Sequence, residues 1–229
     1  MSSWQSISFS SAVIVASVLT ALCSRAPNEA TDKWGKDRLG IWATPKASFV
    51  RRVVTVAIGI SHAVIAFSSP TTNYICRNPE NVNRHLFTWN GYSTTCLFLI
   101  IGIGAPLRLL AFAQLGRNFT FQLAKPSGLT TTGVYRYIQH PGYTGQVLVL
   151  LANLAYLFRW DGVAGCWISQ SLRARLDGWG LVCYGVAALI IMRKVLVRVQ
   201  DEEEMLKKTF GEKWVRWHSA TKRFVPSLI

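Results

Sequence analysis

The sequence contains few charged residues for its length. Only 16% of its 229 residues are charged, whereas a soluble domain usually carries about 25%. Acidic residues are the scarcest: 11 Asp and Glu stand against 25 Lys and Arg, which gives a net charge of +14. Low total charge with a basic excess is typical of apolar membrane spans joined by basic loops that face anionic lipid.

The sequence lacks the patterns typical of nucleic-acid binding, of metal sites and of a disulfide framework. The basic residues lie between apolar runs instead of along a polar face, so the sequence does not favour a nucleic-acid partner. No CxxC or Cys/His spacing predicts a metal site, and an odd number of cysteines argues against a disulfide framework. We therefore expect no metal, and free or buried thiols at all five cysteines: Cys23, Cys76, Cys96, Cys166 and Cys183.

Five apolar runs divide the chain. They cover residues 7–23, 53–69, 86–107, 143–158 and 178–192. A helix that crosses a bilayer needs about 20 mostly apolar residues, with a range of about 17 to 25. The first three runs are long enough; the last two are short and form either two spans or a tilted hairpin that barely crosses. No charged side chain precedes the first run, which favours an uncleaved helix over a signal peptide.

These runs predict an all-α integral membrane protein with about five transmembrane helices, a C-terminal helical hairpin and a cytosolic amphipathic helix. Residues 1–103 would hold the N-terminal transmembrane helices with a basic cytosolic loop. Residues 104–229 would hold the catalytic region, made of a ligand loop, the hairpin and the tail.

The distribution of basic residues predicts the orientation. Residues 25–52 hold seven basic side chains and residues 193–229 hold nine, but residues 70–90 and 159–177 hold only two and three. Because basic loops stay on the cytosolic side, we expect the first loop, the loop at 114–142 and the tail to face the cytosol. The N-terminus would then be lumenal.

The first informative motif is LTTTGVYRYIQHPGYTG at residues 129–145, directly before the fourth apolar run. Pro141 restricts His140 to extended geometry, and the glycines permit close approach of the backbone to a ligand. The motif predicts either a polar ligand pocket at the membrane boundary or a helix entry with one hydrogen-bonded histidine.

The second motif is RVQDEEEMLKKTFGEKWVRW at residues 198–217. As a helix it places Arg198, Glu202, Leu206 and Phe210 on one face, and Gly211 supplies a stop. An exposed Arg198–Glu202 pair would stabilise the helix by only about 0.3 kcal/mol. Because this face also carries the apolar residues, we expect it to pack inward, where buried charges need partners such as a charged ligand.

Together the two motifs resemble the C-terminal signature of the isoprenylcysteine carboxyl methyltransferases and their phospholipid-methyltransferase relatives. That signature is roughly G-x-Y-x-x-x-R-H-P-x-Y-x-G, a helical hairpin, and R-x-x-x-E-E-x-x-L-x-x-x-F-G-x-x-Y/W. The resemblance covers about residues 104–226, including the stretches at 108–111 and 115–119. One departure is Gln139, which stands where the family has arginine, and the tail at 218–222 is about two residues longer.

The resemblance implies a membrane enzyme that uses S-adenosyl-L-methionine and requires no metal. It also implies a location in the endoplasmic reticulum with the active site facing the cytosol. It implies that Arg198 lies at the carboxylate of a lipophilic acceptor, either a prenylated cysteine C-terminus or a small terpenoid acid. Membrane lipid would be a further partner, and the oligomeric state is not indicated. The residues that it assigns to the cofactor are Thr132, Gly133, Val134, Tyr135, His140, Tyr143, Gly145 and Glu202.

Three alternatives stay open at this point. NADPH-dependent sterol reductases resemble both motifs but usually carry Asn-Tyr after His-Pro, where this chain has Gly142-Tyr143. A phospholipid amine could replace the carboxylate as methyl acceptor, although Arg198 favours an acid. A non-catalytic membrane scaffold would not need both motifs intact.

Overall fold

The computed structural model describes residues 3–25, 27–28, 34–35, 38–68, 75–120 and 122–225. Among these residues the regular structure is helical, with two isolated β-bridges and no strand, which confirms the predicted all-α class. The α-helices are α1 (Ser3–Cys23), α2 (Pro45–Ser68), α3 (Gly91–Phe98), α4 (Ala105–Leu115), α5 (Pro141–Tyr156), α6 (Gln170–Leu176), α7 (Gly180–Phe210) and α8 (Glu212–Ala220).

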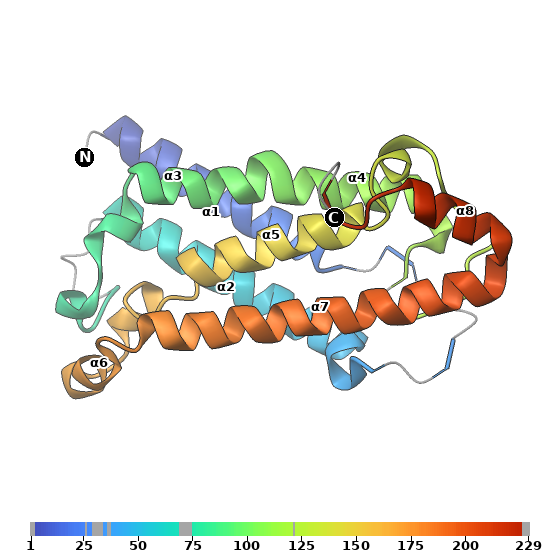
Figure 1. Ribbon diagram of the computed structural model, residues 1–229. Helices are drawn as coiled ribbons and strands as arrows, with labels where there is room; N and C mark the ends of the chain where they lie inside the picture. The colour runs from blue at the N-terminus through green and yellow to red at the C-terminus, as the bar shows by residue number, and fades with distance from the viewer. Residues whose placement is uncertain are drawn as a thin grey trace.

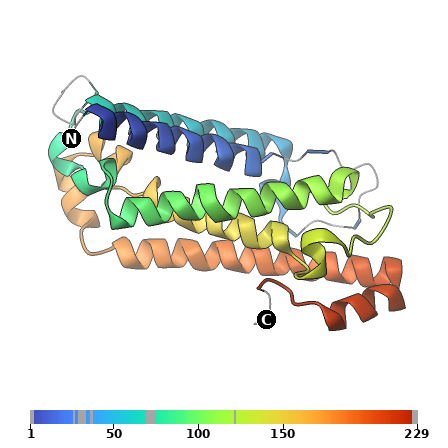
Figure 2. The same cartoon turned by 90° about the horizontal axis from the view of Figure 1, so that it is seen from above.

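The long helices lie side by side along one axis. α1 and α2 pair on one side, α7 lies on the other, and α3, α4 and α5 run between them (Figures 1 and 2). The segments that follow α2 and α5 meet at the end where the N-terminus lies. The segments that follow α1 and α4, together with α8, meet at the opposite end, which we call the site end.

Four helical segments are long and apolar enough to cross a membrane: Ser3–Cys23, Pro45–Ser68, Gly91–Asn118 and Gly180–Phe210. The fifth expected run forms α5, whose 16 residues extend about 24 Å at 1.5 Å per residue. That is shorter than a hydrocarbon core of about 30 Å. The chain is an integral membrane protein in which α5 is enclosed by its neighbours along the same axis (Figure 2).

The C-terminal hairpin differs from its prediction in one respect. The last apolar run and the amphipathic segment were expected as separate helices, but both belong to α7, a single helix of 31 residues. Nothing between residues 192 and 198 breaks the helix, because this stretch holds neither glycine nor proline. Gly211, with φ of 53°, ends it as predicted.

Helices α4 and α5 cross at two glycines. A six-residue π-helical segment, η4 (Leu99–Gly104), joins α3 to α4 and ends at Gly104. A Cβ atom placed on Gly145 of α5 would lie 2.5 Å from the Gly104 carbonyl oxygen and 2.7 Å from the Arg108 backbone nitrogen. Only glycine at this position lets the two backbones approach so closely, as in other membrane helix pairs.

The end opposite the site is closed by covalent and polar contacts. A disulfide joins Cys76 to Cys166, which corrects the expectation that every cysteine would be free; Cys23, Cys96 and Cys183 are free. The two partners are 90 residues apart, so their pairing depends on the packing of two distant loops. Beside them, Arg159 donates to both carboxylate oxygens of Asp161 at 2.7 Å, and Asn83 donates to the same carboxylate.

We expect Gly145→Val to lower the free energy of unfolding by about 1–3 kcal/mol, because the added side chain meets backbone atoms that cannot rotate away. Thermal unfolding in detergent, followed by circular dichroism, measures this loss. Gly185→Val on α7 is the matched control, because a Cβ at Gly185 meets no atom within 4 Å. Equal melting temperatures for the two variants would show that the crossing does not depend on Gly145.

Candidate functional site

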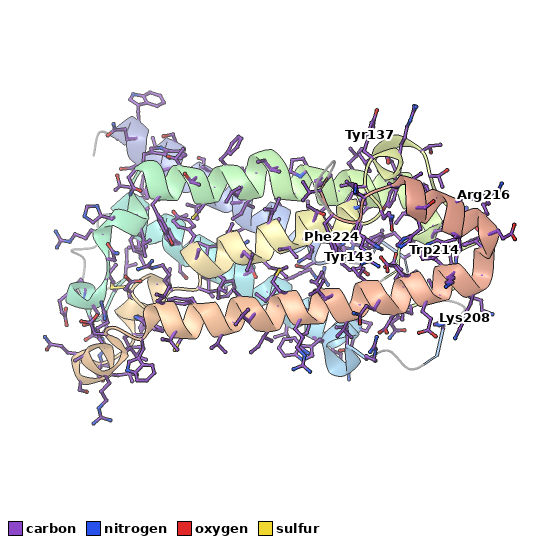
Figure 3. All side chains as sticks on the ribbon, in the orientation of Figure 1. Tyr137, Tyr143, Lys208, Trp214, Arg216 and Phe224 are labelled. Carbon is purple, nitrogen blue, oxygen red and sulfur yellow. A yellow bond between two sulfur atoms is a disulfide. The ribbon has the colours of Figure 1, made fainter. Side chains whose placement is uncertain are left out.

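A cavity of about 540 Å³ lies at the site end. Its walls come from α4, α5 and the loop between them, from residues 187–206 of α7, and from the start of α2 and the segment before it. Five of the predicted site residues line it: Tyr135, His140, Tyr143, Arg198 and Glu202. Figure 3 shows Tyr143, Trp214 and Phe224 gathered at this end, whereas Tyr137 and Arg216 point away.

The start of the first motif is shaped by Gly133. Its φ of 62° lies in the left-handed region that glycine adopts without strain. A Cβ atom there would lie about 2.5 Å from the side chain of Gln114, whose Oε1 accepts a hydrogen bond from the Val134 amide at 2.9 Å. Thr132, Gly133 and Val134 therefore form the outer support of the loop and are not among the residues that line the cavity.

Tyr135 follows this turn and is buried. Its backbone carbonyl accepts a hydrogen bond from Trp217 Nε1 of α8 at 3.1 Å. Burial, together with the negative charge of Glu202, raises the pKa of Tyr135. Its phenol is therefore protonated at neutral pH and available as a hydrogen-bond donor to a ligand in the cavity.

His140 is held by the C-terminal segment. Its amide donates to the Arg223 carbonyl at 2.9 Å, and its Nε2 lies 3.2 Å from Glu203 Oε1. Arg223 donates to both oxygens of the same carboxylate at 2.9 Å. Pro141 does keep His140 out of the helical region, but ψ of 53° is short of the extended value that was expected, because α5 begins at the next residue.

Tyr143 and Glu202 form the second contact between the two motifs. The Tyr143 hydroxyl donates to Glu202 Oε2 at 2.7 Å. Since Glu202 and Glu203 are adjacent on α7, one carboxylate holds the first turn of α5 while the next holds the residue before it. The predicted inward packing of this face of α7 is confirmed for Arg198, which is only 5% exposed, whereas Glu202, Leu206 and Phe210 are half-buried.

Arg108 lines the cavity and was not predicted as a site residue. Its side chain is also only 5% exposed, and its Nη1 donates to the Gly142 carbonyl at 2.9 Å. Its guanidinium lies 4.6 Å and 4.9 Å from the ring centres of Phe112 and Phe119. The sequence did carry a signal, because an arginine at the end of an apolar run indicates a functional site in a membrane protein.

Gly145 has a different position from the other predicted ligands. It lies in the crossing of α4 and α5 and does not line the cavity. Because its backbone contacts Arg108 and Gly104, its place in the motif is accounted for by helix packing that sets the depth of Arg108.

Gln139 stands where the family signature has arginine, and it hydrogen-bonds to α8 and to the residue that follows this helix. Its Nε2 donates to the carbonyls of His218 and Thr221, so its Oε1 must accept from His218 Nδ1, 2.7 Å away. Burial lowers the pKa of His218, despite the opposing charge of Glu203, so the imidazole is neutral with its proton on Nδ1. The lengthened tail therefore supplies the partners of Gln139.

The charges of the cavity wall are unbalanced. Among the described residues that line it, Glu202 is the one acidic side chain. The cationic ones are Arg51, Arg108, Lys194 and Arg198. A low-dielectric cavity with this excess favours an anionic ligand group.

We expect Arg223→Ala to lower the free energy of unfolding by about 1–2 kcal/mol, because it removes two charged hydrogen bonds to a largely buried carboxylate, discounted for the half-exposed guanidinium. The readout is the melting temperature in detergent. Lys222→Ala is the neighbouring control, since that side chain is exposed and only its backbone pairs with the loop. A melting temperature equal to that of the control would contradict the role given to Arg223.

One segment of the chain is similar to a known protein family. Residues 95–177 match the family model described as the isoprenylcysteine carboxyl methyltransferase (ICMT) family. The match includes Arg108 and the His140–Pro141 loop and ends before Arg198 and Glu202, which the structure brings to that loop. No curated protein matches the chain. The chain is an integral membrane protein whose residues 95–177 are similar to the isoprenylcysteine carboxyl methyltransferase family, and this match supports membership of that family.

Proposed function

We propose that this protein is an S-adenosyl-L-methionine-dependent methyltransferase that O-methylates the carboxylate of a lipophilic acceptor at the membrane surface. The observation that carries the proposal is the pair of buried arginines, Arg108 and Arg198, in a cavity with a single acidic side chain, Glu202, among its described lining residues. The positive potential of such a wall favours an anionic ligand group, and a carboxylate is an anionic methyl acceptor to which a guanidinium can donate two parallel hydrogen bonds.

The face of α7 that lines the cavity changes character along its length. Ala187, Ile190 and Ile191 come first, followed by Lys194, Arg198 and Glu202 at successive intervals of four residues. At 1.5 Å per residue, Arg198 lies about 6 Å and Ile191 about 16 Å before Glu202 along the helix. This order suits an acceptor whose apolar tail lies toward the bilayer, whose carboxylate meets Arg198, and whose reaction partner lies at Glu202.

The residues around Glu202 fit the cofactor. Glu202 can accept hydrogen bonds from the cofactor's amino or hydroxyl groups, the protonated Tyr135 phenol can donate one, and His140 lines the same wall. A cavity of about 540 Å³ is within the usual size of small-molecule sites, about 300–1,000 Å³. S-adenosyl-L-methionine, when bound, would supply an electrophilic methyl group.

The protein's own contribution is positioning and desolvation. A carboxylate is ionised at neutral pH, so no general base is needed. Arg198 and Arg108 would hold it in line, and alignment of two reactants supplies much of the rate in such displacements. The apolar wall excludes water, which leaves the carboxylate oxygen less solvated and therefore more nucleophilic.

The alternatives fit the site less well. An ammonium headgroup would enter a cavity whose described lining carries four cations, so a phospholipid amine is disfavoured. The Asn-Tyr pair typical of the reductases would place a side chain where Gly142 stands. A Cβ atom there would lie only 3.1 Å from Arg108 Nη1, so a larger residue would crowd this arginine.

We further propose that the site faces the cytosol, from the endoplasmic reticulum. The Cys76–Cys166 disulfide lies at the opposite end of the bundle, in the two segments with few basic residues. Disulfides persist in oxidising compartments such as the endoplasmic reticulum lumen. The charge distribution and the disulfide thus independently support the same orientation.

The function is tested with purified protein and labelled S-adenosyl-L-methionine, offered with a farnesylcysteine analogue, a terpenoid acid or phosphatidylethanolamine. We expect label in one of the acids. Arg198→Lys should lower kcat/KM about 10- to 150-fold, the equivalent of the roughly 1.5–3 kcal/mol of a charged hydrogen bond to a carboxylate, because lysine cannot make the two-pronged contact.

Arg193→Lys is the matched control for this variant, since Arg193 is an exposed neighbour on α7 that does not line the cavity. Calorimetry should show that Arg198→Lys retains most of the affinity for the cofactor. Binding of NADPH with no binding of S-adenosyl-L-methionine would favour a reductase. Label in phosphatidylethanolamine alone would favour the amine acceptor.

The orientation is tested by counting thiols. Protein extracted from membranes, denatured without reductant and treated with a maleimide should react at three cysteines, and at all five after reduction. Asn118-Phe119-Thr120 is a formal glycosylation sequon in the loop proposed to be cytosolic, and it should carry no glycan. Five reactive thiols before reduction, or a glycan lost in Asn118→Gln, would reverse this part of the proposal.

A further inference from the structure

A second cationic pair lies in the cavity wall, apart from Arg108 and Arg198. Arg51, near the start of α2, donates from Nη1 to the Trp42 carbonyl at 3.0 Å. Lys194 of α7 places its Nζ 5.2 Å from the centre of the Trp42 ring. Two helices that are far apart in sequence thus each bring one cation to the same tryptophan, one to its carbonyl and one to its ring.

Among the described residues, no carboxylate forms an ion pair with Arg51 or Lys194. Arg51 and Lys194 are both half-buried and both line the cavity. By contrast, Arg38, close by in sequence, pairs with Asp201. Half-buried cations that lack a counter-ion favour an anion beside them.

Arg51 and Lys194 lie away from the residues to which methyl transfer is assigned. Lys194 precedes Arg198 by one helical turn, about 6 Å on the bilayer side, and precedes Glu202 by about 12 Å. The acceptor carboxylate needs Arg198 during methyl transfer, and the cofactor is assigned to Glu202. Trp42 is 52% exposed and precedes the candidate membrane span Pro45–Ser68 by three residues. Aromatic and basic side chains are enriched near the ends of such spans, where they meet lipid headgroups.

We propose that Trp42, Arg51 and Lys194 form an anion-binding subsite at the membrane entrance of the cavity, which holds the acidic headgroup of an amphiphile from the surrounding leaflet. This inference rests on the proposed function, because the acceptor's carboxylate would bind here first and then move one helical turn along α7 to Arg198. The ligand class is a carboxylate or phosphate on an apolar tail. The tail extends along Ala187 and Ile191, and the subsite selects charged over esterified lipids.

The test measures binding without methyl transfer. The probe is a fluorescent anthroyloxy-labelled stearic acid, with its methyl ester as the uncharged counterpart, added to protein in phosphatidylcholine nanodiscs. The double variant Arg51→Gln, Lys194→Gln should raise the Kd of the acid about tenfold, as expected when charged hydrogen bonds are lost, and leave that of the ester unchanged. Arg52→Gln is the matched control, because Arg52 is also half-buried on α2 but does not line the cavity.

A second set of nanodiscs, one third phosphatidylglycerol, identifies the source of the anion. If this lipid raises the Kd of the acid more in the wild type than in the double variant, lipid phosphate competes for the subsite. If it raises both equally, the subsite takes the carboxylate alone. The proposal is overturned if the double variant binds the acid as tightly as the wild type does, or weakens acid and ester alike.

Calorimetry with S-adenosyl-L-methionine separates this result from the proposed function. The double variant should bind the cofactor as the wild type does, since the subsite lies about two turns of α7 from Glu202. Charge-dependent binding of the acid in a protein that does not bind the cofactor would refute the methyltransferase proposal and retain the subsite. Cofactor binding without charge dependence would refute the subsite alone.

Discussion

Two successive carboxylates on α7 hold the site together. Glu202 accepts a hydrogen bond from the Tyr143 hydroxyl. Glu203 contacts His140, and both oxygens of the Glu203 carboxylate accept hydrogen bonds from Arg223. These contacts join three segments separated by tens of residues: the His-Pro loop, the long helix and the tail. In a largely apolar environment each such contact is strong and its loss leaves a buried charge. The positions of His140 and Tyr143 in the cavity wall therefore depend on them.

The long helix gives the cavity its direction. Because α7 runs unbroken from its apolar half into its charged half, one face presents aliphatic side chains, then Lys194, Arg198 and Glu202. The same helix thus orders the groups that suit a lipid tail, an acid and a polar ligand. Arg108 approaches from α4 on the other side, at a depth that the contact of Gly104 with Gly145 fixes.

The opposite end of the bundle is held by structural contacts. The Cys76–Cys166 disulfide and the polar contacts of Asp161 close the loops there, far from the cavity along the helices (Figure 1). An odd number of cysteines gave no hint of this bond, because pairing requires two particular loops to meet and not a particular count. The bond ties the ends of helices whose other ends form the site.

The sequence alone determined the helical membrane class, the positions of the apolar runs, the stop at Gly211 and five residues that line the cavity. The class, the runs and the stop follow from local properties, namely apolar length and the positions of glycine and proline. The five lining residues were implied by the resemblance of the two motifs to a known family. Tertiary structure decided which glutamate contacts which partner, because adjacent residues on a helix point about 100° apart. It also decided that Gly145 packs against α4, that Arg108 lines the cavity, and that Arg51 and Lys194 meet at Trp42. Those contacts depend on how segments distant in the sequence approach one another in space, which no local sequence pattern determines.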